Sequence, residues 1–269
     1  MVGGNRANHF FLPTRGQRKQ SMSAEATTKK NAATAQACWS CGAETGGGHF
    51  CASCKKIQPL ASGTDYFALL GLPRKLTLDT ADLERRFHQL SWKLHPDNFG
   101  RGSEYERELS LERSSQLNDA YRALREPISR VEYLLASAGM RREGQQKQQA
   151  PPELLEEVFE LNESLDELRA ARKAGGDPAE MAALTRKLEA ARAGFEEKLG
   201  VVDAEMELLS REWDRQGAPD AGTQVGQAGA AAELSAGQRK VMERMNDVLN
   251  RRSYIRNLAQ SVQKELAEA

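Results

Sequence analysis

Apolar residues recur at helical spacing along most of the chain after residue 64, and this periodicity restricts the fold more than any other feature. The first clear stripe, with intervals of three or four residues, consists of Leu83, Phe87, Leu90 and Leu94. Further stripes follow until Leu266, and proline or glycine separates them. The composition, rich in Ala, Glu, Leu, Arg and Lys, also favours helices over sheets. We therefore predict an all-α fold.

A His-Pro-Asp tripeptide ends the first striped helix. Thr80 and Asp82 are the candidate caps at its start. Pro96 lacks a backbone donor and biases His95 away from helical angles, so the helix must stop here. His95 and Asp97 then flank a stiff corner that faces solvent, which we interpret as a contact point. Acid–base catalysis has little support, because no nucleophile lies nearby in sequence and no glycine-rich phosphate loop is present; we predict no enzyme activity.

All four cysteines lie in one segment, CWSCGAETGGGHFCASC, as two C-x-x-C pairs: Cys38, Cys41, Cys51 and Cys54. Two such pairs can surround one structural zinc ion per chain. The spacing favours a metal over disulfides or free thiols, and zinc over a redox iron centre. His49 could compete as a ligand, but four cysteines already complete the site, so we expect an ordinary loop residue. Residues 38–58 should form a separate module, folded by its metal and too small to brace the rest of the chain.

Charge and composition argue against a nucleic-acid or membrane partner. The formal net charge is +0, and Lys55 and Lys56 alone do not make a basic groove beside the cysteines. No apolar run approaches the length of a membrane span. Residues 1–37 are basic, rich in hydroxyl groups and almost free of acids, which is typical of a transit peptide, although an ordinary disordered tail remains the alternative.

The helical stripes fall into two groups. Residues 64–140 form the first, and the polar segment 141–152 is typical of a linker. Residues 153–269 carry three further stripes, which predict an antiparallel three-helix bundle. Residues 216–232 are of low complexity, and we expect them to form a flexible loop between the second and third helices of the bundle.

The first bundle helix has more apolar residues than its stripe requires. Leu155 and Phe159 lie about 120° from the stripe that runs from Leu154 to Leu168, and they neighbour each other at i and i+4. Acidic residues surround them, and Tyr254 lies off the stripe of the third helix. These residues either pack against another helix or form a docking site, because an exposed apolar patch with a charged rim often marks one.

The layout of a helix, a His-Pro-Asp corner and a helix with NDAY resembles a J-domain, the module by which DnaJ-like co-chaperones activate DnaK-type chaperones. More narrowly, LNDAYRALREPISRVEYLL and ELLEEVFELNESLDEL resemble the HscB (Jac) family of iron–sulfur cluster co-chaperones. Animal members carry a similar double C-x-x-C segment. The resemblance covers roughly Cys38 to Leu266.

The resemblance implies two docking sites. The DnaK-type chaperone would contact a corner and a basic helix face, formed by His95, Pro96, Asp97, Arg85, Arg86 and Lys93. An IscU/Isu-type scaffold would bind a patch with an acidic rim, formed by Leu155, Phe159, Glu160, Glu163, Glu167 and Tyr254. Glu156 departs from the bacterial pattern, which has an apolar residue there.

The function implied is delivery: the bundle holds the scaffold, the J-domain brings in the chaperone, and ATP hydrolysis by the chaperone promotes cluster transfer. The implied location is the mitochondrial matrix, with the cytoplasm as the alternative. Two other functions remain open: a general J-domain co-chaperone for unfolded clients, and a zinc-ribbon nucleic-acid-binding protein. The neutral charge argues against the second.

Overall fold

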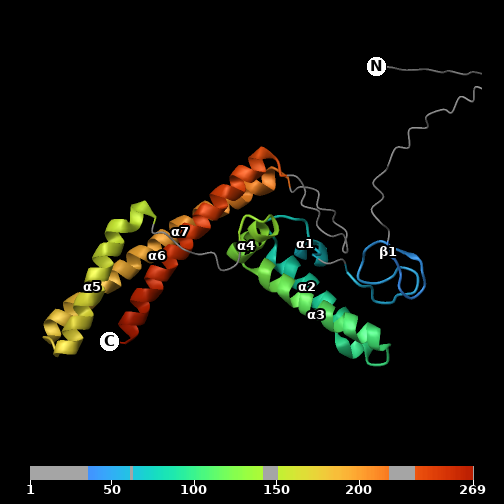
Figure 1. Cartoon of the computed structure of the whole chain (residues 1–269), viewed down its shortest axis with the longest axis horizontal. Coiled ribbons are helices and arrows are strands. Elements are labelled where there is room, and N and C mark those ends of the chain that lie inside the picture. The colour runs from blue at the N-terminus through green and yellow to red at the C-terminus, as the bar shows by residue number, and fades with distance from the viewer. Residues whose placement is uncertain (1–35, 61–62, 142–150, 218–233, 269) are drawn as a thin grey trace, which may run out of the picture. The chain divides into compact units, whose positions relative to one another are not determined.

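The computed structural model describes residues 36–60, 63–141, 151–217 and 234–268, and its helices confirm the all-α prediction (Figure 1). The helices are α1 (Tyr66–Leu69), α2 (Thr80–Leu94), η1 (Pro96–Phe99), α3 (Glu104–Arg125), α4 (Pro127–Ser137), η2 (Pro152–Leu154), α5 (Leu155–Ala174), α6 (Pro178–Arg215) and α7 (Ala236–Ala267). Two short strands, β1 (Gln36–Ala37) and β2 (Glu44–Thr45), pair antiparallel. Most of the predicted transit peptide, linker and loop lies outside the described residues, although Gln36 and Ala37, at the end of the predicted transit peptide, form β1.

Helix α2 begins at a different cap from the one that the sequence suggested. Asp79, not Thr80 or Asp82, is the N-cap, and its carboxylate accepts the N–H of Ala81 at 2.9 Å. Asp79 adopts an extended backbone just before the first turn, which is the conformation an N-cap requires, whereas Thr80 and Asp82 are already helical. The C-terminal end agrees with the prediction, because His95 caps α2 and Pro96 opens η1.

Helices α1, α2 and α3 share one apolar core with the cysteine segment. The buried residues of this core are Ile57, Phe67, Leu69, Leu70, Leu72, Leu83, Leu94, Leu109, Leu117, Ala120 and Leu124. Ile57 comes from the cysteine segment and is fully buried. Close by, the Lys56 ammonium pairs with the buried Glu106 carboxylate at 2.8 Å, and the Trp39 ring packs edge-on against Tyr105. The last residues of the cysteine segment therefore help to build the core of the first helical domain, whereas the sequence suggested a separate module.

The second core lies in the bundle of α5, α6 and α7. Its centre contains Leu161, Leu168, Leu188, Phe195, Met206, Trp213, Met245 and Ile255. Leu76, from the loop before α2, and Val131, Leu134 and Leu135 of α4 belong to the same buried cluster. The bundle core therefore extends into the first helical domain. None of the helices in the described ranges is long and apolar enough to cross a bilayer.

Two charged side chains fix this junction. The Asp214 carboxylate, near the end of α6, accepts the backbone N–H groups of Leu76 and Thr77, each at 2.8 Å. Arg130 of α4 is buried and donates to the carbonyls of Leu124, at 2.9 Å, and of Leu76. Side chains from two helices thus satisfy both backbone polar groups of Leu76, which would otherwise be costly to bury.

Candidate functional site

The four cysteine sulfur atoms converge, as their spacing predicted. All four Sγ atoms lie within 4.8 Å of one another. Two similar turns bring them together: the N–H of Gly42 donates to the carbonyl of Cys38 at 2.9 Å, and the N–H of Lys55 donates to the carbonyl of Cys51 at 3.0 Å. Four sulfur ligands at this separation could hold a metal ion.

Hydrogen bonds to the sulfur atoms of Cys38 and Cys51 favour the thiolate form that a metal ion requires. Gln58 Nε2 lies 3.3 Å from Cys38 Sγ, and the N–H of Ser40 lies 3.4 Å from the same atom. Burial acts to raise the pKa of Cys38, but backbone hydrogen bonds from Cys41 and Ser40 outweigh it and lower that pKa to about 6. The backbone hydrogen bond from Cys54 likewise lowers the pKa of Cys51. Cys41 differs: the backbone hydrogen bond from Ala43 acts to lower its pKa, but the contact with the Cys54 side chain and burial outweigh it and raise that pKa to about 11. This donor set fits a thiophilic cation such as zinc.

His49 lies outside the group of ligands, as expected, but it is not an ordinary loop residue. Its Nδ1 accepts a hydrogen bond from Arg113 Nη1 at 3.0 Å, so Nε2 carries the proton and donates to the carbonyl of Leu69, also at 3.0 Å. Burial, and then the charge of Arg113, lower the pKa of His49 to about 4. His49 is therefore a neutral side chain that connects the cysteine segment to α1 and α3.

The His-Pro-Asp corner is rigid in its backbone and open in its side chains. The N–H of Asp97 donates to His95 Nδ1 at 3.3 Å, and Asn98 Nδ2 donates to the carbonyl of Trp92 at 2.6 Å. Pro96 occupies the first position of η1, so the corner is a turn of 3₁₀-helix. The side chains of His95 and Asp97 are 57% and 90% exposed. The corner can thus be touched from solvent without rearrangement.

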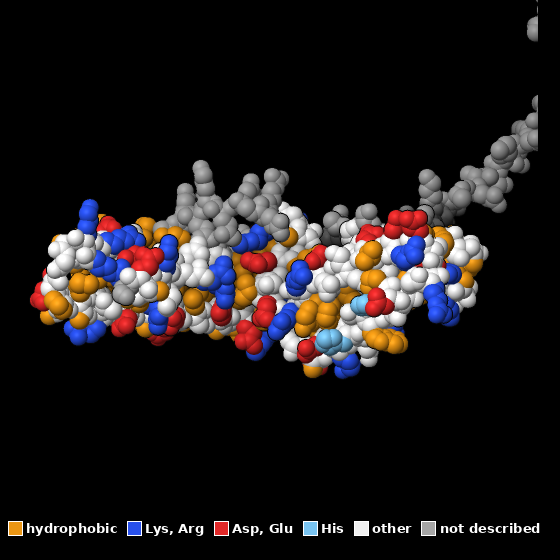
Figure 2. Space-filling view, turned by 90° about the horizontal axis from the view of Figure 1, so that it is seen from below, with side chains coloured by type: hydrophobic (Ala, Val, Ile, Leu, Met, Phe, Trp, Pro, Cys, Tyr) orange, Lys and Arg blue, Asp and Glu red, His pale blue; other side chains and the backbone are white. Residues whose placement is uncertain are grey.

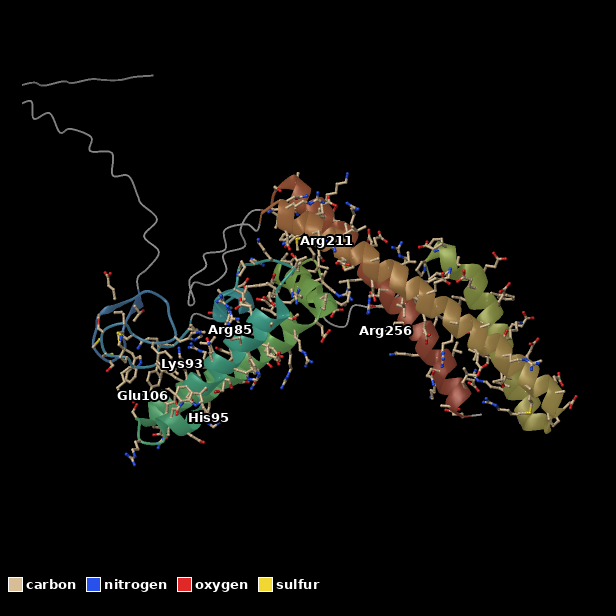
Figure 3. All side chains as sticks on the ribbon, turned by 180° about the vertical axis from the view of Figure 1, so that it is seen from behind. Arg85, Lys93, His95, Glu106, Arg211 and Arg256 are labelled. Atoms are coloured by element: carbon tan, nitrogen blue, oxygen red, sulfur yellow. The ribbon has the colours of Figure 1, made fainter. Side chains whose placement is uncertain are left out.

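The predicted basic residues lie on α2, before the corner (Figure 3). Arg85 and Arg86 both pair with Asp82, and Arg86 also donates to the carbonyl of Gly71, so part of their charge is already engaged. Lys93, the second-last residue of α2, is exposed. Trp92, which the sequence analysis did not single out, is 75% exposed. Its exposure could have been predicted from the sequence, because it lies three residues before His95 and off the apolar stripe of the helix.

Two apolar residues of the predicted patch on the bundle, both on α5, are exposed to solvent. Leu155 is 54% exposed and Phe159 is 73% exposed. Glu160, Glu163 and Glu167 are also exposed on this helix. Tyr254 of α7 differs, because it is half-buried and packs against the bundle core. The structure therefore leaves Leu155 and Phe159 largely exposed to solvent, while Tyr254 exposes only part of its surface.

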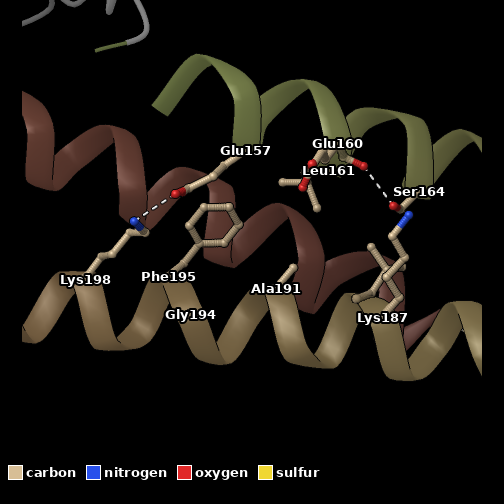
Figure 4. A pocket seen from close by; sticks show the side chains of 10 residues that line it. Glu157, Glu160, Leu161, Ser164, Lys187, Ala191, Gly194, Phe195 and Lys198 are labelled. Carbon is tan, nitrogen blue, oxygen red and sulfur yellow. Dashed lines mark hydrogen bonds and ion pairs between the residues drawn. The ribbon is translucent and has the colours of Figure 1, made fainter. Parts of the chain in front are cut away.

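A groove between α5 and α6 was not foreseen from the sequence. Its volume is about 330 Å³, with an apolar floor that includes Leu161 and Phe195 (Figure 4). Lys198 and Glu157 form an ion pair at 2.9 Å across it. It formed no recognisable pattern in the sequence, because the residues that face each other across it, such as Leu161 of α5 and Phe195 of α6, are far apart in the chain.

Charges of both signs alternate on the surface. On the face drawn in Figure 2, Lys and Arg side chains are interspersed with Asp and Glu. Many of the described cations pair with neighbouring acids, among them Arg211 with Glu207 and Arg244 with Glu212. This face lacks the continuous basic stripe that would track a nucleic-acid backbone.

Comparison with known proteins gave consistent relatives, although no family model matches the chain. It is 34% identical over 161 residues to the human "Iron-sulfur cluster co-chaperone protein HscB", covering 58% of this chain and 68% of that protein. A "Co-chaperone protein HscB homolog" of Vibrio parahaemolyticus is 42% identical over 104 residues, covering 39% of this chain. The match spans 61% of the length of that relative. The crystal structure of human co-chaperone protein HscB superposes with a TM-score of 0.55 at 26% identity, covering 86% of this chain and 98% of that one.

Proposed function

This chain belongs to the HscB family of iron–sulfur cluster co-chaperones, and from that premise we propose that it joins a DnaK-type chaperone to an IscU/Isu-type scaffold. It would stimulate the ATPase of the chaperone and so promote transfer of the cluster from the scaffold. The protein would itself make and break no covalent bonds. The observation that carries this proposal is the His-Pro-Asp corner, which has a rigid backbone and exposed side chains at the end of a basic helix.

The corner is suited to a partner that presents a cation. Asp97 is almost fully exposed, so its carboxylate can pair with such a group with little rearrangement of its own chain. Pro96 keeps the turn preorganised, which reduces the entropy lost on docking. Arg85, Arg86 and Lys93 give the preceding helix a basic face, and charges of this kind mainly raise the association rate.

The patch on α5 is suited to the scaffold. Leu155 and Phe159 can enter an apolar pocket of a partner, and a few such residues usually carry most of the binding energy. Glu160, Glu163 and Glu167 would favour a basic surface around that pocket. Tyr254 would contribute its exposed edge from α7.

The four cysteines would hold one structural zinc ion. Zinc would supply the bonds that fold a segment with few apolar residues of its own. Cys38, Cys41, Cys51 and Cys54 would be its ligands. The basic composition of residues 1–37, which is almost free of acids, supports a location in the mitochondrial matrix, with the cytoplasm as the alternative.

The proposal is tested by the steady-state ATPase rate of a DnaK-type chaperone. We expect His95→Gln to abolish stimulation while leaving the helical circular dichroism unchanged, because His95 is exposed and only caps a turn. His88→Gln is the matched control: His88 is an exposed histidine on the same helix, and its loss should leave stimulation intact. Full stimulation by folded His95→Gln would remove the chaperone-docking role.

Metal analysis tests the cysteine site. Protein purified under reducing conditions should contain one zinc per chain, and replacing Cys38 and Cys41 by Ser should release it. Absence of zinc from the wild-type protein would overturn this part of the proposal.

A further inference from the structure

Arg113 of α3 is a buried cation that the proposed function does not use. It is 2% exposed and lies in the middle of α3 rather than at a docking surface. Burial lowers its pKa to about 10, so it keeps its charge at neutral pH. A buried guanidinium is retained only where its hydrogen bonds compensate the cost of desolvation. The question is therefore what its bonds hold together.

The partners of Arg113 on one side belong to the cysteine segment. Its Nη2 donates to the carbonyl of Gln58 at 2.7 Å, and its Nη1 donates to His49 Nδ1 at 3.0 Å. Gln58 is itself buried, and its amide Nε2 donates to Cys38 Sγ at 3.3 Å. One residue thus separates Arg113 from a proposed metal ligand. Groups in this position orient the ligands of a metal and are costly to lose.

On the other side, the same stretch of α3 holds the end of α2. Ser110 Oγ and Ser114 Oγ donate to the carbonyl of Leu94 at 2.7 and 3.2 Å. Ser110 and Ser114 flank Arg113 within one helical turn, and Leu94 directly precedes His95. Hydrogen bonds therefore connect Cys38 to α3 through Gln58, and connect the same turn of α3 to Leu94, the residue before the His-Pro-Asp corner.

We propose that Arg113 couples the metal centre to the α2–α3 hairpin, so that the bound metal orders the helix end that carries the His-Pro-Asp corner. The inference rests on the proposed metal site, but not on the identity of any protein partner. Coupling of this kind is reciprocal: if the metal stabilises the hairpin through Arg113, then loss of Arg113 must weaken metal binding.

The test is a zinc titration of the full chain against a chromophoric chelator. Arg113→Met should weaken zinc binding by about tenfold or more, as expected for loss of a group that orients metal ligands. Arg130→Met is the matched control, because Arg130 is an equally buried arginine of the same domain that also donates to backbone carbonyls. None of its hydrogen-bond partners among the described residues lies in the cysteine segment. Arg130→Met should change zinc affinity by less than about twofold.

A second measurement follows the hairpin directly. Removal of zinc from the wild-type protein should speed amide hydrogen exchange of residues 104–125 and 91–99, and Arg113→Met should reduce this difference. Equal zinc affinity of wild type and Arg113→Met would overturn the inference. An equal loss of zinc affinity in Arg113→Met and Arg130→Met would also overturn it, because it would indicate general destabilisation. If Arg113→Met does not fold, Gln58→Met replaces it, since it removes the bond to Cys38 Sγ and should weaken zinc binding in the same way. A wild-type protein without zinc would instead refute the proposed metal site.

Discussion

At the scale of single residues, Glu106 shows how one side chain can serve two purposes. Its carboxylate completes a capping box at the start of α3, accepting the N–H of Ser103 at 3.1 Å, and it also pairs with Lys56. The capping box can be read from the sequence, because Ser103 and Glu106 have its spacing. The pair with Lys56 cannot, since 50 positions separate the two residues and no local pattern joins them.

We predict that the stability contributed by Glu106 depends on pH. The hydrogen bond from Lys56, followed by that from Ser103, lowers the pKa of Glu106 in the folded protein. The ionised carboxylate therefore stabilises the fold above its ordinary pKa, and this stability is lost as the pH falls through the lowered pKa. Glu106→Gln should lower the melting temperature at pH 7, and the difference from wild type should vanish in acid.

The control for this experiment is Glu108→Gln, a neighbouring and exposed carboxylate on the same helix. Its melting temperature should match that of wild type at every pH. A Glu106→Gln difference that stays the same at every pH would show that the ionised carboxylate contributes nothing.

At the scale of elements, the bundle helices are the part that the sequence predicts best. The stripe of α5 is buried at Leu161, Leu165 and Leu168, and Leu155 and Phe159 lie outside it in solvent, as their angular positions indicated. A helical period is a local property, so one sequence is enough to detect it. Tyr254 was less predictable, because its partial burial depends on how α7 packs against the other helices.

Because α5 has buried and exposed apolar residues, we predict that substitutions at the two kinds of position affect stability differently. Replacing Leu155 and Phe159 together by Ala should change the free energy of unfolding by less than about 0.5 kcal/mol, because exposed side chains contribute little packing. Leu165→Ala should cost about 2 to 5 kcal/mol, because it leaves a cavity in the core. Urea unfolding measures both. A large loss of stability in the double mutant would mean that the patch is packed rather than free.

At the scale of the whole molecule, contacts between domains were the least predictable feature. Ile57 enters the core of α1, α2 and α3, and Leu76 joins the core of the bundle. Each is a single apolar residue in a loop, and no periodicity marks it. The polar linker segment suggested independent parts, whereas the described residues, which begin at Gln36, belong to one compact unit.

We predict that Asp214 transmits stability across the junction between the helical domains. Its carboxylate accepts two backbone N–H groups, of Leu76 and Thr77, and Asp214→Ala would leave both without their partner. Loss of charged hydrogen bonds of this kind should cost about 2 kcal/mol. Calorimetry should show a lower and broader transition, as the two domains begin to unfold separately. Asp166→Ala, which breaks only an exposed pair with Arg169, should leave the transition unchanged.

The central claim, that one chain carries two independent docking sites, is tested most directly by the chaperone ATPase rate measured with and without the iron–sulfur scaffold. The account predicts that the scaffold raises the rate further with the wild-type protein. It predicts that replacing Leu155, Phe159 and Tyr254 by Ala removes this increment while the scaffold-free stimulation stays normal, and that His95→Gln removes both. A triple mutant that is stable and still shows the full increment from the scaffold would contradict the account.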